Sequence, residues 1–163
     1  MKVIVMGVTS TGKSLTGALL ANALEGRFVD GDDLHPEANR RKMAAGTPLT
    51  DADRWPWLDA IGAAMAAEPG SMVVACSALK RAYRERIAAA AGEVAFVHLH
   101  GPKDVIAARM KAREGHFMPF SLLDSQLATL EMPDEDECAR TFDLREPPEV
   151  IVRQAAAWVR TLA

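Results

Sequence analysis

Residues 7–14 read Gly-Val-Thr-Ser-Thr-Gly-Lys-Ser and match the pattern G-x-x-x-x-G-K-[ST]. The apolar run Val3–Met6 stands directly before this motif, and a helical stretch from Leu15 to Leu24 follows it. A loop of this kind needs a buried strand before it and a helix after it, because the loop amides and the helix N-terminus bind phosphate together. The motif therefore predicts a strand, a phosphate-binding loop and a helix in this order.

The spacing within the motif assigns a role to each of its parts. The backbone amides of residues 8–14 are expected to surround the β-phosphate of a nucleotide. Lys13 is expected to reach the β- and γ-phosphate oxygens, and the Ser14 hydroxyl to ligate Mg²⁺. The alternative is a chance match in a glycine-rich turn, and the strand–loop–helix context argues against it. The predicted nucleotide-binding residues are Gly7, Val8, Thr9, Ser10, Thr11, Gly12, Lys13 and Ser14.

The bulk properties are those of a globular protein. A chain of 163 residues with 49% hydrophobic residues suits one domain, residues 1–163, with a full core. The net charge of −3 argues against a broad nucleic-acid footprint. No apolar run approaches the ~20 residues of a membrane span, and no signal peptide is visible, so a cytoplasmic protein without a membrane partner is expected. Cys76 and Cys138 could form one disulfide, but two free thiols are expected. His98 and His100 are interpreted as packing or phosphate-side residues.

Apolar runs alternate with helical stretches along the whole chain. Such alternation predicts a parallel sheet covered by helices on both faces. The expected strands are Lys2–Met6, Arg27–Asp30, Ser71–Cys76, Val94–His100 and a weaker Thr141–Leu144. The expected helices are Lys13–Leu24, Pro36–Ala45, Asp51–Glu68, Ala78–Ala91, Lys103–Arg113, Phe120–Leu130 and Pro148–Leu162. Thr50 followed by two acids in the first turn predicts an N-cap for the third of these helices.

Polar residues gather where the first three strands end, and ligands bind at that edge of a parallel sheet. Asp30 and Asp32 follow the second strand and point to the same side if the backbone is extended. Asp30 is predicted to hold Mg²⁺ through water, and Asp32 to orient an acceptor hydroxyl and take its proton. The alternative is that Asp32 or Asp33 merely caps a helix that begins near Pro36.

Cationic side chains recur at three places outside the loop. Arg54 stands beside Trp55-Pro56-Trp57, where flanking aromatics could wall a pocket while the guanidinium grips a carboxylate. Lys80 follows the third strand and is a second candidate for substrate binding. Arg109 and Arg113 are four apart on one helix face, and Gly115 after them could act as a hinge. An arginine-bearing lid would neutralise a γ-phosphate and exclude water, whereas the alternative is an exposed basic helix.

These stretches resemble the gluconokinases, a family of small kinases related to shikimate and nucleoside-monophosphate kinases. The resemblance runs from Val3 to about Pro133. The similar stretches are GVTSTGKS, DGDDLHPEANRRKMAAGTPLTDADRWPWL, ACSALKRAYRERI, MKAREGHF and LLDSQLATLE. The second is the most specific because it is long and rich in unusual residues.

The resemblance implies a three-layer α/β/α P-loop kinase fold with a five-stranded parallel sheet and a helical lid at about 109–131. It implies ATP- and Mg²⁺-dependent phosphorylation of D-gluconate at its 6-hydroxyl, which feeds sugar-acid catabolism, and a homodimer. The resemblance implies that Asp32 is the acid that faces the acceptor, and that Arg109 and Arg113 are the arginines of the lid. It also suggests sugar-acid contacts, which are His35, Arg54, Ser77, Lys80, His116 and Gln126.

Two departures and three alternatives accompany the resemblance. The family usually has glycine where Ser10 stands, so a positive φ there would strain the loop, and Leu127 replaces a commonly aromatic position. A kinase for shikimate or another aldonate is the nearest alternative, but the Gly-Gly-Gly run of shikimate kinases is replaced here by residues 76–80. A switch GTPase lacks support because the guanine-specifying N-K-x-D is absent. A sensor that binds ATP and gluconate without turnover is the third alternative.

Overall fold

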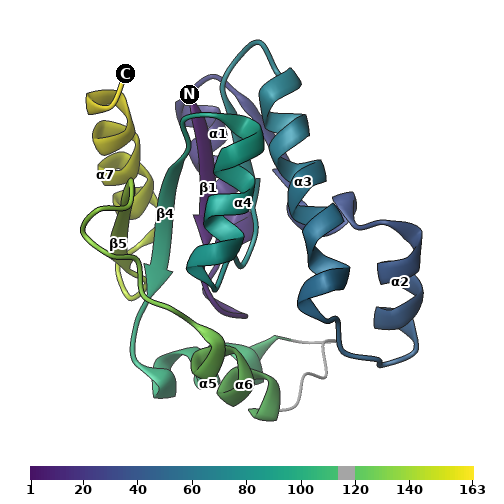
Figure 1. Cartoon of the computed structure of the whole chain (residues 1–163). Coiled ribbons are helices and arrows are strands. Elements are labelled where there is room, and N and C mark those ends of the chain that lie inside the picture. The colour runs from purple at the N-terminus through teal and green to yellow at the C-terminus, as the bar shows by residue number, and fades with distance from the viewer. Residues whose placement is uncertain (114–119) are drawn as a thin grey trace.

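The computed structural model describes residues 1–113 and 120–163, and within them one five-stranded parallel sheet has the order β2-β3-β1-β4-β5 (Figure 1). The strands are β1 (Lys2–Met6), β2 (Arg27–Asp30), β3 (Met72–Ala75), β4 (Ala95–His100) and β5 (Ala139–Asp143). The first two have the bounds expected from the sequence. The weak fifth strand is confirmed, although it begins two residues earlier than expected.

Helices cover both faces of the sheet, and two further helices lie beyond the carboxyl ends of the strands (Figure 1). Helices α1 (Lys13–Ala23) and α7 (Pro148–Thr161) pack on one face, and α3 (Asp51–Ala67) and α4 (Arg81–Ala91) pack on the other. Helix α2 (Glu37–Ala44) precedes α3, and a 3₁₀ turn, η1 (Gly31–Leu34), follows β2. Helices α5 (Lys103–Ala112) and α6 (Phe120–Thr129) lie beyond the strand tips, opposite the two chain ends (Figure 1). The expected three-layer arrangement is thereby confirmed.

Strand β1 explains why a central parallel strand is apolar throughout. Val3 and Val5 belong to the core that includes Leu20 of α1 and the α7 residues, whereas Ile4 and Met6 belong to the core beneath α3 and α4. All four side chains are fully buried. Because successive side chains alternate between the faces, a strand covered on both sides must be apolar at every position.

The start of α3 follows its sequence signal. The Thr50 hydroxyl accepts the Asp53 N–H at 3.1 Å, and the Asp53 carboxylate accepts the Thr50 N–H at 2.9 Å, which completes a capping box. The N-cap predicted at Thr50 is confirmed.

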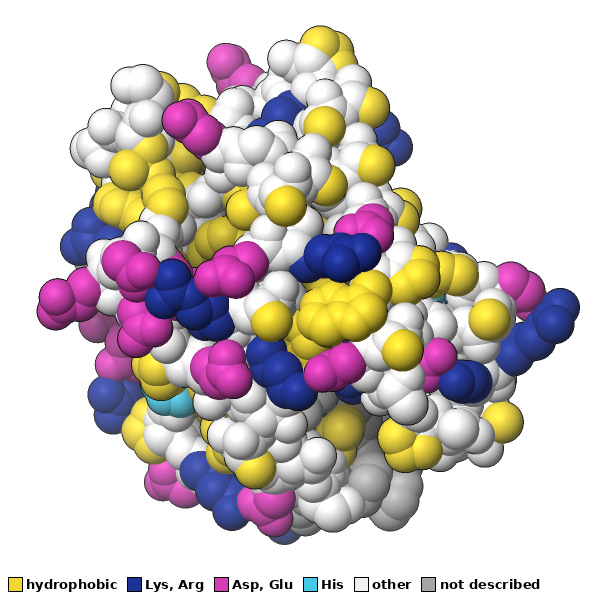
Figure 2. Space-filling model, in the orientation of Figure 1, with side chains coloured by type: hydrophobic (Ala, Val, Ile, Leu, Met, Phe, Trp, Pro, Cys, Tyr) yellow, Lys and Arg dark blue, Asp and Glu magenta, His cyan; other side chains and the backbone are white. Residues whose placement is uncertain are grey.

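Cys76 is buried and Cys138 is exposed, and both are free thiols as expected. On the face shown in Figure 2, Lys and Arg side chains are interspersed with Asp and Glu side chains. None of the helices described is both long and apolar enough to cross a membrane.

Arg84 on α4 is a buried cation that holds the segment after α6 against the body of the protein. Its side chain is 1% exposed and pairs with Glu137, which is 9% exposed. The two guanidinium–carboxylate distances are 2.6 and 3.2 Å. Three carbonyl oxygens at 2.9–3.2 Å accept the remaining N–H groups, and they belong to Ala78, Leu79 and Glu131. The arginine therefore fixes the polypeptide on both sides of the site described below.

Arg84→Met is expected to lower the free energy of unfolding by about 3–5 kcal/mol, because it leaves the Glu137 carboxylate buried without its partner. The matched control is Arg86→Met, since Arg86 pairs with Asp59 at the surface, where both side chains are nearly half exposed and an ion pair contributes little. Urea unfolding followed by circular dichroism measures both variants. Equal losses in the two variants would contradict the role given to Arg84.

Candidate active site

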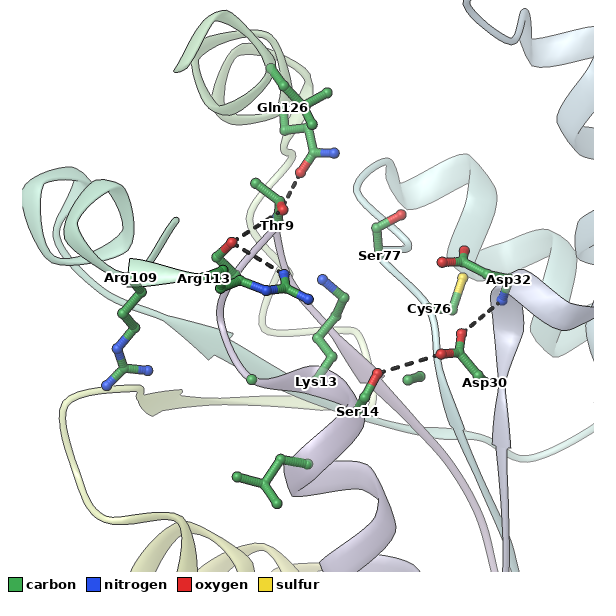
Figure 3. Close-up of a pocket in the computed structure, with 15 residues that line it drawn as sticks. Thr9, Lys13, Ser14, Asp30, Asp32, Cys76, Ser77, Arg109, Arg113 and Gln126 are labelled. Carbon is green, nitrogen blue, oxygen red and sulfur yellow. Dashed lines mark hydrogen bonds between the residues drawn. The ribbon is translucent and has the colours of Figure 1, made fainter. Parts of the chain in front are cut away.

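A cavity of about 680 Å³ opens where β1, β2 and β3 end (Figure 3). Most of the residues predicted from the sequence to form a site line this cavity. They are Thr9, Ser10, Gly12, Lys13, Ser14, Asp30, Asp32, Ser77, Arg109, Arg113 and Gln126. The structure therefore brings together the phosphate loop, the acid pair after β2 and side chains of α5 and α6.

The phosphate loop ends at the open N-terminus of α1. Gly12 is the N-cap with φ 87°, a left-handed conformation that glycine adopts without strain, and no side chain caps the helix. The first N–H groups of α1 therefore face the cavity without a side-chain cap, as an anion site requires. Ser10 also has a positive φ, of 62°. The position that is usually glycine in the family thus has the conformation that glycine favours, and Ser10 adopts it at a cost in strain.

Lys13 folds back over the phosphate loop. Its Nζ donates to the Val8 carbonyl oxygen at 2.8 Å. Burial lowers the pKa of Lys13 to about 8, and the nearby Asp32 opposes this shift. The ammonium is desolvated and has one loop carbonyl as its acceptor. Phosphate oxygens that replace the missing water would therefore stabilise its charged form strongly. The position suits the predicted contact with the β- and γ-phosphates.

Asp30 and Asp32 lie on either side of a glycine that is packed too closely for any side chain. A Cβ on Gly31 would lie 2.6 Å from the Ala75 carbonyl oxygen. Asp30 accepts the Asp32 N–H at 3.0 Å and caps the 3₁₀ turn, and its other oxygen lies 3.5 Å from Ser14 Oγ (Figure 3). The alternative that Asp32 or Asp33 caps the helix near Pro36 is wrong, because Pro36 is the N-cap of α2 and no side chain caps that helix. Asp30 caps the η1 turn instead. Its second oxygen still faces Ser14.

The Asp32 carboxyl lies at the cavity and caps no helix (Figure 3). Burial in the cleft, followed by the charge of Asp30, raises the pKa of Asp32 above its ordinary value, while Lys13 opposes the rise. A carboxylate with a raised pKa is a better proton acceptor than an ordinary aspartate. This environment suits the role of orienting a hydroxyl and accepting its proton.

Arg109 of α5, Arg113 at the C-terminal end of α5, and Leu122 and Gln126 of α6 line the cavity wall (Figure 3). Arg113 Nη1 lies 3.4 Å from Ser10 Oγ, and the Thr9 N–H donates to Gln126 Oε1 with 2.6 Å between N and O. Arg109 donates to the Leu144 carbonyl oxygen at 2.6 Å, and its guanidinium is turned away from Lys13 (Figure 3). Arg109 and Arg113 thus both line the cavity, but their guanidinium groups point in different directions.

Three predicted sugar-acid contacts do not line this cavity as the described residues form it. His35 is buried, stacks on Trp57 with 4.0 Å between ring centroids and lies 3.2 Å from Asn39 Nδ2. Arg54 and Lys80 are considered below. His116 and the hinge candidate Gly115 lie outside the described residues.

Arg54 and Lys80 converge on Asp51, a residue that sequence reasoning treated only as part of a helix cap. Lys80 Nζ lies 3.2 Å from Asp51 Oδ2, and Arg54 Nη1 lies 3.4 Å from Asp51 Oδ1. The Tyr83 hydroxyl also donates to Asp51. The hydrogen bond from Tyr83, followed by that from Lys80, holds the pKa of Asp51 below its ordinary value. Asp51 and Arg54 are three apart on α3, so their pairing has a sequence signal. Lys80 and Tyr83 belong to the start of α4, and sequence spacing gives no signal of their contact with Asp51.

His98 lies beneath the site on β4 and is fully buried. Its Nδ1 is 3.2 Å from Thr141 Oγ1, and its ring stacks on His100 at 5.2 Å. Burial, followed by the neighbouring His100, lowers the pKa of His98 to about 4. The packing interpretation of this residue agrees with its burial.

Stability is expected to fall on acidification because His98 stays neutral in the folded protein while an unfolded histidine takes up a proton below about pH 6.5. The loss begins near that pH and ends near pH 4, where the folded protein also takes up the proton. Between pH 7 and pH 5, His98 accounts for about 2 kcal/mol. Urea unfolding of wild type and His98→Gln at pH 7 and pH 5 gives the free energy of unfolding at each pH. The contribution of His98 is the amount by which the wild type loses more stability than the variant between these two pH values. Identical pH dependences would refute it.

A phosphate loop at the carboxyl edge of a parallel sheet, open to a cavity lined by acids and arginines, defines the class of P-loop phosphotransferases. A family model described as an AAA domain matches residues 3–133. A gluconokinase of Gluconobacter oxydans is 46% identical over 155 residues, which cover 93% of this chain and 86% of that protein. The chain belongs to the gluconokinase family.

Solved structures agree with this assignment. The crystal structure of a gluconokinase from Sinorhizobium meliloti has a TM-score of 0.89 and 50% identity, and the match covers 99% of this chain and 93% of that one. Shikimate kinase from Aquifex aeolicus has a TM-score of 0.64 at 13% identity, with coverage of 99% of this chain and 97% of that chain. The second likeness shows a shared fold alone.

Proposed function

We propose that this protein is a gluconokinase that transfers the γ-phosphoryl group of ATP to the 6-hydroxyl of D-gluconate. The products are ADP and 6-phospho-D-gluconate. Membership of the family supports the reaction. The observation that carries the proposal from the structure is the convergence of Lys13, Asp32 and Arg113 on one cavity. In-line transfer needs a nucleotide phosphate, a hydroxyl acceptor and compensating positive charge at one place.

The phosphates are positioned by the loop and by the start of α1. The amides of residues 8–14 other than that of Thr9, which donates to Gln126, would bind the β-phosphate. Lys13 would leave Val8 to contact the β- and γ-phosphate oxygens. Arg113 would move a short way from Ser10 to the γ-phosphate. Arg109 would have to release the Leu144 carbonyl before it could do the same. The two arginines therefore differ in how much rearrangement their roles require.

Ser14 and Asp30 fit the Mg²⁺ ion that this reaction uses. Both offer oxygen ligands, they lie 3.5 Å apart, and Mg²⁺ is commonly held by one or two protein oxygens together with phosphates and water. When bound, the ion would offset negative charge on the β- and γ-phosphate oxygens.

Asp32 would orient the 6-hydroxyl of the acceptor toward the γ-phosphorus and accept its proton. The bond from the acceptor oxygen to phosphorus forms as the bond from phosphorus to the leaving oxygen of ADP breaks. Water has to be kept out, because it competes as acceptor. Supporting this, α5 and α6 stand over the strand tips, and we propose residues 109–131 as the lid of a single kinase domain spanning residues 1–163.

The sugar-acid contacts are proposed as Asp32, His35, Arg54, Ser77, Lys80, His116 and Gln126. Asp32, Ser77 and Gln126 have the strongest structural support because they line the cavity. Arg54 and Lys80 could bind the gluconate carboxylate only if it replaced Asp51 between them. His35 is the least accessible of the described candidates, since Trp57 and Asn39 already occupy its ring.

We also propose that the protein acts as a cytoplasmic homodimer without a nucleic-acid or membrane partner. The net charge of −3 and the mixed charges in Figure 2 support the absence of a nucleic-acid partner. Light scattering coupled to size-exclusion chromatography tests the dimer, and a single monomer peak at micromolar concentration would refute it.

The function is tested by ADP release in a coupled assay with Mg²⁺-ATP. The acceptors are D-gluconate, other aldonates, shikimate, AMP and none. Turnover that depends on gluconate, with little release without acceptor, is the expected result. Binding of ATP without turnover on any acceptor would favour a sensor, and preference for another acid would assign a different kinase.

A further inference from the structure

The side chain of Gln126 links helix α6 to the phosphate loop. The Thr9 backbone N–H donates to Gln126 Oε1 with 2.6 Å between N and O. A backbone N–H can only donate, and a carboxamide accepts only through its oxygen. The Thr9 amide therefore fixes which end of the carboxamide faces the loop, and the Nε2H₂ group must face the other way.

The free end of this carboxamide faces the cavity. Figure 3 shows Nε2 of Gln126 directed away from Thr9, toward the side on which Ser77 lies. Both residues line the same cavity. Within the described part of the chain, the Gln126 side chain forms its hydrogen bond through Oε1, which accepts from the Thr9 N–H. Gln126 thus presents two N–H donors of fixed direction to whatever occupies the space between the loop and Ser77.

A neutral amide suits this position for an electrostatic reason. Asp30 and Asp32 already place two carboxylates on the cavity wall. A glutamate at position 126 would accept the Thr9 N–H at least as well, because charged acceptors form stronger hydrogen bonds. It would, however, add a third carboxylate and offer no donor. The amide therefore does something in the cavity that tethering the loop alone would not require.

We propose that Gln126 is a positioning residue that binds an oxygen of the acceptor through Nε2 while Oε1 holds the phosphate loop. This inference rests on the proposed function. The ligand it recognises is a polyhydroxy acid, through a hydroxyl or carboxylate oxygen on the side of the cavity near Ser77. Because one side chain contacts both the acceptor and the loop, the bound acceptor, α6 and Thr9 become one connected unit. Acceptor binding thereby stabilises the arrangement in which α6 is held against the loop.

The test compares Gln126→Glu, Gln126→Met and the control Gln154→Glu, since Gln154 is exposed on α7, away from the cavity. Glutamate keeps the acceptor for Thr9 and removes the donors, whereas methionine of similar length removes both. Steady-state kinetics with D-gluconate separate kcat from KM, and calorimetric titration measures the affinity for ADP. Thermal unfolding checks that each variant is folded.

In Gln126→Glu we expect kcat/KM for gluconate to fall about 10- to 100-fold, mostly through KM, with ADP affinity within about threefold of wild type. Gln126→Met should lose at least about tenfold, and Gln154→Glu should match wild type. Wild-type kinetics in Gln126→Glu beside a defect in Gln126→Met would overturn the inference, because the amide would then only tether the loop. A loss confined to ADP affinity would also overturn it. Absence of gluconate turnover in the wild type itself would instead refute the proposed function.

Discussion

Asp32→Asn is expected to lower kcat by about 10²- to 10⁴-fold, the range that a positioned general base contributes. Asparagine keeps the size of the side chain and can still contact a hydroxyl, but it cannot take the proton. The wild-type kcat should fall as pH falls through the pKa of Asp32, which burial and Asp30 raise above that of an ordinary aspartate. The variant should lose this acidic limb. Initial rates with saturating Mg²⁺-ATP and D-gluconate across pH measure both effects.

The matched control is Asp33→Asn, one residue further along the same 3₁₀ turn. Asp33 is exposed and does not line the cavity, and its backbone carbonyl, which accepts from Arg40, is unchanged by the substitution. Its activity should equal that of wild type. Near-normal turnover in a folded Asp32→Asn protein would show that Asp32 is not the base and that the acceptor proton leaves by another route.

Lys13→Met is expected to lower kcat/KM for ATP by about 10²- to 10³-fold, the loss typical when one donor to a developing negative charge is removed. We propose that the ammonium contacts the β- and γ-phosphates, and methionine preserves only the length and the apolar part of the lysine stem. The free energy of unfolding should not fall. Burial disfavours the charged form of Lys13, and the substitution removes that unfavourable buried charge. The coupled assay and urea unfolding measure the two quantities.

Lys111→Met is the control for the loss of one positive charge. Lys111 is exposed on α5 and does not line the cavity. A similar loss in both variants would attribute the effect to the general field of the protein rather than to contact with phosphate. Unchanged kcat/KM in Lys13→Met would rule out the assigned contact.

Features carried by consecutive residues could be predicted from the sequence. The phosphate loop, the strand before it and the helix after it follow from one short pattern and the apolar run beside it. The continuous burial of Val3–Met6 follows from the same logic, since a central parallel strand has no exposed face. The cap at Thr50 needs only residues three apart, and the capping box is confirmed.

The acid pair shows where prediction from the chain alone becomes partial. The spacing of Asp30 and Asp32 places both at one strand end, and both line the cavity. The different contacts of the two acids depend on residues from other segments. The Ala75 carbonyl oxygen leaves no room for a side chain at Gly31 between them, and Ser14 faces Asp30. Capping by Asp32 or Asp33 was the sequence alternative, but the acid that caps is Asp30, and the element that it caps is a 3₁₀ turn that the helix pattern does not indicate.

Side-chain partners that come from distant segments were out of reach of sequence reasoning. Arg54 and Lys80 were selected as free cations, yet Asp51 pairs with both in the tertiary structure. Arg109 shares a helix face with Arg113 in sequence, but its guanidinium is held by the Leu144 carbonyl. Asp51 stands three residues before Arg54 on α3, but the pairing of Asp51 with Lys80 and that of Leu144 with Arg109 join segments with no sequence relation. A charge in the sequence is therefore a candidate whose availability only the packing decides.

By itself, the sequence determined the phosphate-binding loop, the layered fold and the family of this protein, because hydrophobic periodicity and a contiguous motif act over a few residues. The tertiary structure alone decided which cations are free, which acid faces Ser14, and that Gln126 holds the Thr9 amide across 117 positions. Such contacts depend on the direction of side chains brought together by strand order and helix packing. Hydrogen bonds are directional and short, and so their pairing is settled only when the whole chain is in place.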